Sequence, residues 1–401
     1  MMPVPGSDTK LKPAGKIVVF LFIVACLAGA YYLFVGRSST QSSGGSSSGG
    51  SSLFSSSPDV EIGVAYGTEK QRWLEWAVRE FSQTSDGKHI KVNLIPMGSQ
   101  EGAHAILDGD KRIHAWSPAS AAYKDVFLQD WQAKYSGNPI AREESLALTP
   151  MVFVIWDERY QAFRQKYKNL SFQTVSQALQ EKGGWDTIAG KPEWGLFKFG
   201  HTNPVQSNSG LMTVVLAAYS YQNKTSNLNL KDVVDVGFQN WMEKLELGAN
   251  GMSNSTGNMM KEMVLKGPSS FDALLVYESV AIDYLKNAEG RWGQIRVVYP
   301  EYNAWNENPY YVLDVPWSST DQRKAADKFL SFLLTEPIQK ESLNHGFRPA
   351  NATVPVKFPE SPFVRYASYG IQVDLQRICE PPKAEVVTNL LASWQRWQVN
   401  R

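Results

Sequence analysis

Cysteine is scarce in this chain, and neither sign of charge is in excess. The 401 residues include two cysteines, and 40 basic residues nearly balance 39 acidic ones, for a formal net charge of +1. Cys26 lies within an apolar run, so we expect no structural disulfide with Cys379. The balanced charge gives no electrostatic footprint for nucleic acid. Because 43% of the residues are hydrophobic, the sequence predicts a protein with a sizeable core, divided into about two compact units.

The signatures of common catalytic and cofactor sites are also missing. The five histidines show no metal-ligand spacing such as H-x-x-x-H. Neither of the glycine-rich nucleotide-binding motifs, G-x-x-x-x-G-K-[ST] or G-x-G-x-x-G, occurs in the sequence. No G-x-S-x-G sequence lies between a predicted strand and a predicted helix, as a nucleophile elbow requires. We therefore expect no metal, no cofactor and no catalytic residues.

A long apolar run near the N-terminus is the first informative segment. Residues 17–36 carry no charge, and a helix of about 20 such residues can cross the hydrocarbon core of a bilayer. Three lysines precede the run and Arg37 follows it, so the positive-inside rule places residues 1–16 in the cytoplasm. This pattern predicts a single-pass anchor in the cell membrane, with the rest of the chain on the extracytoplasmic side.

Two other interpretations of this run stay open. The small residue before Cys26 fits a lipidation signal, although the apolar run continues for ten residues beyond that cysteine. A cleaved signal peptide usually has a shorter apolar stretch than this one. All three interpretations place the rest of the chain outside the cytoplasm. Residues 37–57 are mostly Ser and Gly, which predicts a flexible linker with a reach of roughly 25 Å.

The remainder of the chain alternates between strand and helix patterns. Residues 60–65 predict a buried strand, 68–84 an amphipathic helix, and 90–95 a second strand. Further strands are expected at 113–116, 149–156, 196–200, 271–277, 295–299 and 310–315, and further helices at 211–221 and, capped by Thr320, at 320–334. This alternation is typical of an α/β protein with largely parallel sheets.

Polar residues crowd three turns that follow predicted strands and precede predicted helices. Thr68 follows the first strand, Ser99 follows the second, and the turn that includes Ser207 and Ser209 precedes the helix at 211–221. A helix N-terminus exposes backbone N–H groups that suit a polar or anionic ligand group. Each turn also has a simpler interpretation, in which Thr68, Ser207 or Ser209 only caps its helix. Because turns at the carboxyl ends of parallel strands converge on one crevice, we favour a shared binding site.

The order of these segments resembles the type II periplasmic binding proteins, specifically a subgroup related to molybdate-type and other extracellular solute-binding proteins. The resemblance covers residues 60–401. Its most specific parts are Asn203-Pro204 followed by Ser207-Asn208-Ser209-Gly210, and Gly346-Phe347-Arg348-Pro349. The matching segments also include Tyr66-Gly67-Thr68, Gly98-Ser99, Trp116-Ser117-Pro118, Val276-Tyr277-Glu278 and Tyr299-Pro300-Glu301. The tail at 369–394 resembles solute-binding proteins that are often accompanied by von Willebrand A-type partners.

This resemblance implies a bilobal type II fold with two mixed-sheet lobes joined by a two-strand hinge. Lobe 1 is expected to contain residues 58–149 and 311–401, and lobe 2 residues 150–310. The crossings are expected near 149–152 and 311–316. The expected ligand-binding residues are Thr68, Ser99, Ser117, Asn203, Ser207, Ser209, Tyr277 and Glu278.

The function implied is a membrane-anchored solute-binding protein that closes its two lobes over a small polar ligand, for uptake through an ABC-type permease. The ligand class stays open between an oxyanion, a sugar and another polar solute. Glu69 and Glu278 would repel an oxyanion if they faced it, whereas Trp116, Trp194 and Trp305 would suit a sugar. Two alternatives remain: a tethered sensor or assembly protein with a von Willebrand A-type partner, and an extracytoplasmic hydrolase.

Overall fold

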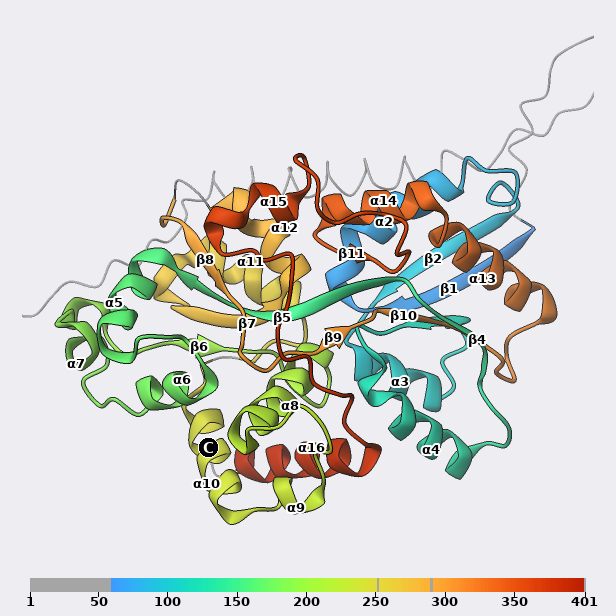
Figure 1. The fold of residues 1–401 in the computed structure, drawn as a ribbon. Helices are drawn as coiled ribbons and strands as arrows, with labels where there is room; N and C mark the ends of the chain where they lie inside the picture. Colours follow the sequence, from blue (N-terminus) through green and yellow to red (C-terminus); the bar gives the residue numbers. More distant parts are fainter. Residues whose placement is uncertain (1–58, 251, 289–290, 400–401) are drawn as a thin grey trace, which may run out of the picture. The chain divides into compact units, whose positions relative to one another are not determined.

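The computed structural model describes residues 59–250, 252–288 and 291–399 (Figure 1). The predicted cytoplasmic segment 1–16, the anchor 17–36 and the linker 37–57 lie outside these residues. Within the described part of the chain, no helix combines the length and the apolar character needed to cross a membrane.

The first of two sheets contains five strands in the order β2-β1-β3-β10-β4. Parallel pairing joins β1 to β2 and β3, whereas β10 runs antiparallel to both β3 and β4. The strand bounds are β1 (Val60–Tyr66), β2 (Ile90–Pro96), β3 (Ala115–Ser117), β4 (Ile140–Ser145) and β10 (Pro309–Leu313). The sheet is therefore mixed, with three parallel strands whose carboxyl ends lie together.

Helices cover both faces of this sheet. The amphipathic helix α2 (Gln71–Phe81) buries Trp73, Leu74, Ala77 and Phe81, and it packs beside α13 (Thr320–Leu333) and α14 (Glu336–Ser342). Phe81 of α2 meets Phe329 of α13 with their ring centroids 5.2 Å apart. The helices α3 (Ser99–Leu107) and α4 (Lys124–Lys134) pack against each other, and α3 also contacts β1 and β3.

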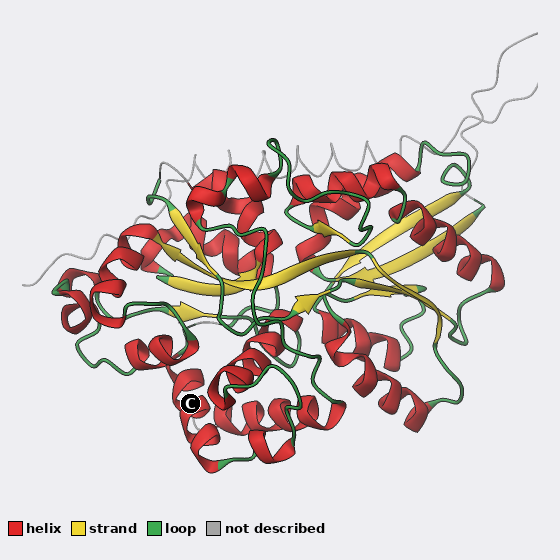
Figure 2. Cartoon of the chain, in the orientation of Figure 1, coloured by secondary structure: helices red, strands yellow, loops and turns green. Residues whose placement is uncertain are grey.

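The second sheet is built around the long strand β5 (Ala147–Trp156). Its order is β11-β5-β7-β6, and β8 and β9 also pair with β5. The strands are β6 (Phe199–Gly200), β7 (Ala273–Tyr277), β8 (Ile295–Val298), β9 (Trp305–Asn306) and β11 (Arg348–Pro349). All residues of β5 except Leu148 are buried, because neighbouring strands pair with its edges and helices lie on both faces of the sheet (Figure 2). This burial explains why the segment is a continuous apolar run.

Helices surround the second sheet as well. Those that touch its strands are α5 (Asp157–Tyr167), α8 (Asn208–Gln222), α11 (Thr256–Lys266) and α12 (Glu278–Ala288), together with α14 at β11. The others before the C-terminal region are α6 (Phe172–Leu179), α7 (Trp185–Ala189), α9 (Leu230–Val233) and α10 (Val236–Gly248), and the short 3-10 turns include η1 (Thr68–Lys70) and η2 (Ala121–Tyr123).

The chain passes between the sheets three times: a long connection runs from β10 through α13 and α14 to β11, and two short passages lie earlier in the sequence. The first lies at Leu146, between β4 and β5, and the second lies at residues 307–308, between β9 and β10. The two passages are side by side, because the Leu146 N–H donates to the Asn308 carbonyl at 3.1 Å. The sequence placed these crossings near 149–152 and 311–316, a few residues later in each case. The domain boundaries themselves stay a prediction.

The C-terminal region contacts both halves. Its first helix, α13, packs on β1 and β10 of the first sheet, and α14 contacts α2, α13 and β11. The helix α15 (Pro362–Arg365) comes later, and α16 (Ala384–Val399) lies beside α8, α9 and α10 (Figure 1). The buried face of α16 contains Val386, Val387, Leu390, Trp394 and Trp397, and the helix also contacts α4. The prediction assigned residues 311–401 to lobe 1, but α16 makes most of its contacts with α8, α9 and α10 of the second half.

Two helix caps differ from the prediction. Ser319, not Thr320, caps α13: its hydroxyl accepts from the Gln322 N–H at 3.2 Å, and the Gln322 side chain accepts from the Ser319 N–H at 3.0 Å. The predicted helix at 68–84 is divided into η1 and α2, and the Thr68 side chain does not cap it. A serine one residue upstream offers the same hydroxyl as Thr320, so the sequence pattern alone does not select between them.

Replacing Trp116 tests the packing of the first sheet. The side chain is 1% exposed, and its ring centroid lies 5.0 Å from that of Phe127 and 5.1 Å from that of Tyr311. We expect Trp116→Ala to lower the free energy of unfolding by about 3–5 kcal/mol, measured by urea denaturation. The control is Trp292→Ala, since that side chain is 42% exposed. An equal effect of the two substitutions would contradict the packing described.

Candidate functional site

The turns after β1, β2 and β3 are held together by hydrogen bonds. The Gly67 N–H donates to the Ser117 carbonyl at 3.1 Å, and the Met97 N–H donates to the Tyr66 carbonyl at 3.1 Å. The Ser99 hydroxyl accepts from the Ala119 N–H at 3.0 Å. Parallel strands bring their carboxyl ends to one edge, and here that edge carries Thr68, Ser99 and Ser117. The Ser117 side chain is fully buried, and its hydroxyl has no hydrogen-bond partner among the described residues.

The turn before α8 faces this edge from the second half. The Ser209 hydroxyl lies 2.6 Å from the Thr202 hydroxyl and 2.6 Å from the Thr256 hydroxyl at the start of α11. Ser207 is the N-cap residue of α8, but its side chain makes no capping hydrogen bond, and its hydroxyl lies 3.4 Å from that of Ser209. The simpler interpretation, in which Ser207 or Ser209 only caps the helix, is therefore wrong. The hydroxyls form a cluster instead.

Asn203 has a local role in this turn. Its side-chain oxygen accepts from the Val205 N–H at 3.0 Å, which fixes the turn in the way an Asx-turn does. Its own N–H donates to the Ser253 carbonyl at 3.0 Å, so the segment before α11 is tied to the turn before α8. Asn203 thus positions two neighbouring loops.

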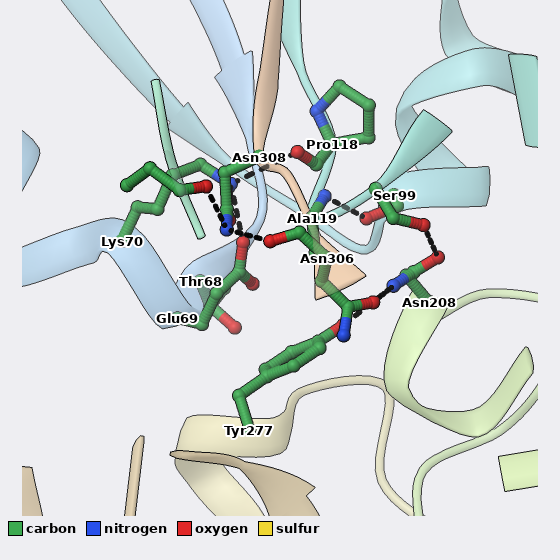
Figure 3. Close-up of polar contacts among 12 residues, drawn as sticks. Thr68, Glu69, Lys70, Ser99, Pro118, Ala119, Asn208, Tyr277, Asn306 and Asn308 are labelled. Carbon is green, nitrogen blue, oxygen red and sulfur yellow. Dashed lines mark hydrogen bonds and ion pairs between the residues drawn. The ribbon is translucent and has the colours of Figure 1, made fainter. Parts of the chain in front are cut away.

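Side chains of the two halves meet directly (Figure 3). The Thr68 and Ser255 hydroxyls lie 3.0 Å apart, and the Ser120 hydroxyl donates to the Asn208 side-chain oxygen at 2.7 Å. The Asn208 amide nitrogen donates to the Tyr277 hydroxyl at 3.1 Å and to the Asn306 side chain at 2.9 Å. Burial raises the pKa of Tyr277 well above its ordinary value, and the nearby Glu69 carboxylate acts in the same direction.

A buried lysine at this edge was missed by the sequence analysis. Lys70 is fully buried, and its ammonium group donates to Glu69 at 2.5 Å, to Asn308 at 3.0 Å and to the Pro118 carbonyl at 3.2 Å. Burial lowers the pKa of Lys70, and the Glu69 carboxylate opposes this effect. In the sequence, a Glu-Lys pair at the start of a helix is typical of solvent-exposed charge. The burial of Lys70 depends on Asn308, which lies 238 residues later and could not be inferred from the local sequence.

Glu278 is engaged by an arginine from the C-terminal region. Both of its oxygens accept from Arg348, at 2.8 Å and 2.7 Å, and Tyr299 also donates to it. Burial raises the pKa of Glu278, while the Arg348 guanidinium acts in the opposite direction. Arg348 also donates to the carbonyls of Gln372 and Val373. The Glu278 carboxylate, which would repel an oxyanion if it faced the ligand, is therefore neutralised by Arg348 inside the fold.

A cavity of about 550 Å³ lies where the halves meet. It opens between η1 and α2 on one side and α11 and α12 on the other, and both Thr68 and Ser255 line it. At its rim the Arg72 guanidinium donates to Asp283 at 2.8 Å, which joins α2 to α12. A volume of this order fits a small molecule. No group of three His, Cys, Asp or Glu side chains suited to a metal ion occurs in the described ranges.

Comparison with known proteins places the chain in a family. A family model of bacterial extracellular solute-binding proteins matches residues 62–348, which is more than half of the chain. The protein therefore belongs to this family, whose members bind solutes rather than catalyse reactions. The resemblance inferred from the sequence is confirmed. A comparison with curated proteins gave no match.

Solved structures with the same fold include three solute-binding proteins. The sulfate-binding protein SubI from Mycobacterium tuberculosis is 16% identical, with a TM-score of 0.54 over 85% of this chain and 99% of its own. AfuA from Actinobacillus pleuropneumoniae, with fructose-6-phosphate bound, is 11% identical, with a TM-score of 0.58 over 84% and 98%. Iron-bound HitA from Pseudomonas aeruginosa is 15% identical, with a TM-score of 0.55 over 84% and 99%. The predicted bilobal α/β fold is confirmed by these similarities.

The Glu278–Arg348 pair can be tested by substitution. We expect Arg348→Met to lower the free energy of unfolding by about 3–5 kcal/mol, because it leaves a buried carboxylate without its partner. The double variant Arg348→Met with Glu278→Gln should recover part of this loss in urea denaturation. Lys328→Met is the control, since Lys328 and its partner Asp86 are both about half exposed (51% and 52%). A loss below about 1 kcal/mol for Arg348→Met would show that the pair is dispensable.

Proposed function

We propose that this protein captures a small polar solute in the cavity between its two lobes and holds it by hinge closure. The observation that carries the proposal is the meeting of hydroxyl-bearing turns from both halves, with Thr68 and Ser255 3.0 Å apart at the cavity wall. Membership of an extracellular solute-binding family supports an extracytoplasmic location and uptake through an ABC-type transporter.

Hinge closure is supported by the way in which the halves are connected. At the cavity the halves are joined by polar pairs, Thr68 with Ser255 and Arg72 with Asp283, which water or a ligand can replace when the halves separate. The two chain passages at 146 and 307–308 lie next to each other and can act as one hinge. A ligand that touches both lobes would shift the population towards the closed state by its differential affinity for the two states.

The proposed ligand contacts come from both lobes. Thr68 lines the cavity, whereas Ser99 and Ser117 of the same half and Asn203, Ser207, Ser209 and Tyr277 of the other do not line it in this structure and would meet a ligand only in a more open state. Most of these groups are hydrogen-bonded to other hydroxyl or amide groups of the protein, and a polar ligand can replace such a partner at small net cost. Glu278 is left out of this set because Arg348 occupies both of its oxygens.

Solute binding is tested with the purified full-length chain. We expect titration calorimetry against a panel of oxyanions, sugars, amino acids and peptides to detect at least one ligand, and small-angle scattering to show a smaller radius of gyration with that ligand. Thr68→Val should weaken binding about tenfold, which corresponds to about 1.4 kcal/mol. The matched control is Thr335→Val, since Thr335 is exposed and its hydroxyl bonds only its own turn. Binding of no solute, with capture of a protein partner instead, would favour the sensor or assembly function.

The membrane tether is the second part of the proposal. It is supported by the uncharged run at 17–36 and the Ser/Gly segment at 37–57, which would keep the binding lobes within roughly 25 Å of the bilayer.

Deleting residues 1–36 should move the protein from the membrane fraction to the soluble fraction, provided that an exchanged cleavable signal peptide still directs its export. Cys26→Ser should leave the protein in the membrane fraction, because the uncleaved helix needs no lipid. Release by Cys26→Ser would show that the protein is anchored by lipidation instead.

A further inference from the structure

The cavity between the lobes has a negatively charged end formed by lobe 1. The Glu69 side chain lines the cavity and is only 4% exposed. One of its oxygens accepts from Lys70, while Glu75 and Glu101 also line the same wall. Lys70 balances the charge of Glu69, but a simple anion would still face the carboxylates of Glu75 and Glu101, which is unfavourable in a partly enclosed site.

The opposite wall has the chemistry of an anion site. The exposed Lys261 of α11 lines the cavity, and it forms no ion pair among the described residues. The 11-residue helix α11 begins at Thr256. The Ser255 hydroxyl accepts from the Asn258 N–H, and the N–H groups of Thr256 and Gly257 and the positive end of the helix dipole are left at the cavity. Gly257 lines the cavity as well, and a Cβ added there would meet only the Ser255 hydroxyl, at 4.0 Å. A simple cation would have no partner on this side.

The two walls are adjacent. Glu69 follows Thr68, whose hydroxyl lies 3.0 Å from that of Ser255, and Gly257 lies two residues beyond Ser255. Apolar surface is supplied to the same cavity by Met97, Val280 and Tyr284. Arg72 and Asp283 at the rim are paired with each other, so they add no net charge. A ligand with opposite charges at its two ends and a short carbon chain between them would match all of these groups.

We propose that the solute is a zwitterion, with an ammonium group bound at Glu69 and a carboxylate or phosphonate group bound beside Lys261 at the N-terminal end of α11. This inference rests on the proposed solute-binding function and specifies its ligand class. Glu69 would give the site its selectivity for the ammonium end. Gly257 would keep the helix N-terminus open for the anionic end.

Matched probes separate the two ends of the ligand. Titration calorimetry on the full-length chain would compare 2-aminoethylphosphonate and β-alanine with ethylphosphonate and propionate, which lack the ammonium group, and with ethylamine, which lacks the anionic group. We expect at least one zwitterion to bind at least tenfold more tightly than both of its single-charge analogues. The carboxylate and phosphonate pairs identify which anionic group the helix prefers.

Substitutions test each end separately. Glu69→Gln should weaken zwitterion binding at least tenfold without weakening ethylphosphonate binding. Gly257→Ala should weaken both, because the added methyl group fills the cavity wall, while the helix itself gains a better helix former. Lys261→Gln should also weaken both. The controls are Glu80→Gln on α2 and Lys266→Gln on α11, since both side chains are exposed and neither lines the cavity.

Folding is checked by thermal melting, since Glu69→Gln also removes the carboxylate partner of the buried Lys70. If that variant is unfolded, Gly257→Ala and Lys261→Gln still decide the anionic end, and the analogue series decides the ammonium end. Equal affinity for a zwitterion and for one of its analogues would overturn the inference. Binding of only a sugar or a simple oxyanion would also overturn it but leave the proposed function intact, whereas binding of no solute would overturn both.

Discussion

The backbone hydrogen bonds of β5 are the constraint on which the rest of the structure depends. Along its ten residues this strand pairs with β11 and β9 at its first half and with β7 and β8 at its second. These pairings bring Arg348 of β11 and Tyr277 of β7 to the region where the lobes meet. They also place the β4–β5 passage beside the β9–β10 passage, where we propose the hinge. A strand buried on both faces can hold this position because its side chains are almost all apolar.

Polar groups hold the joint between the sheets, beside an apolar core that is continuous across both halves. Asn306 and Asn308 donate to the carbonyls of Thr149 and Ala147, so the two passages are bound by side-chain amides as well as by backbone. Lys70 is held by three acceptors, which satisfies a charge that would otherwise be costly to bury. These satisfied hydrogen bonds give the joint a defined geometry.

Local patterns in the sequence predicted the main elements well. The strands at 60–65, 90–95 and 149–156 follow from periodicity and apolar runs, and the polar turns after them were found because turn residues have local signatures. The partners of these residues could not be predicted in the same way. The contacts of Glu278 with Arg348 and of Lys70 with Asn308 join residues 70 and 238 positions apart, and nothing in the local sequence records them. The amphipathic pattern of α16 likewise indicates that one face of this helix is buried, but it does not indicate which helices cover that face.

The pairing of β5 also determines when this protein can fold. Its partners β7, β8, β9 and β11 lie between residues 273 and 349, more than 100 residues further along the chain. During synthesis, β5 therefore emerges long before any strand that can cover its edges, and its apolar residues stay unpaired until most of the chain is available. Loops of this length slow folding and expose aggregation-prone surface. The second sheet can therefore be completed only after residue 349 has been synthesised.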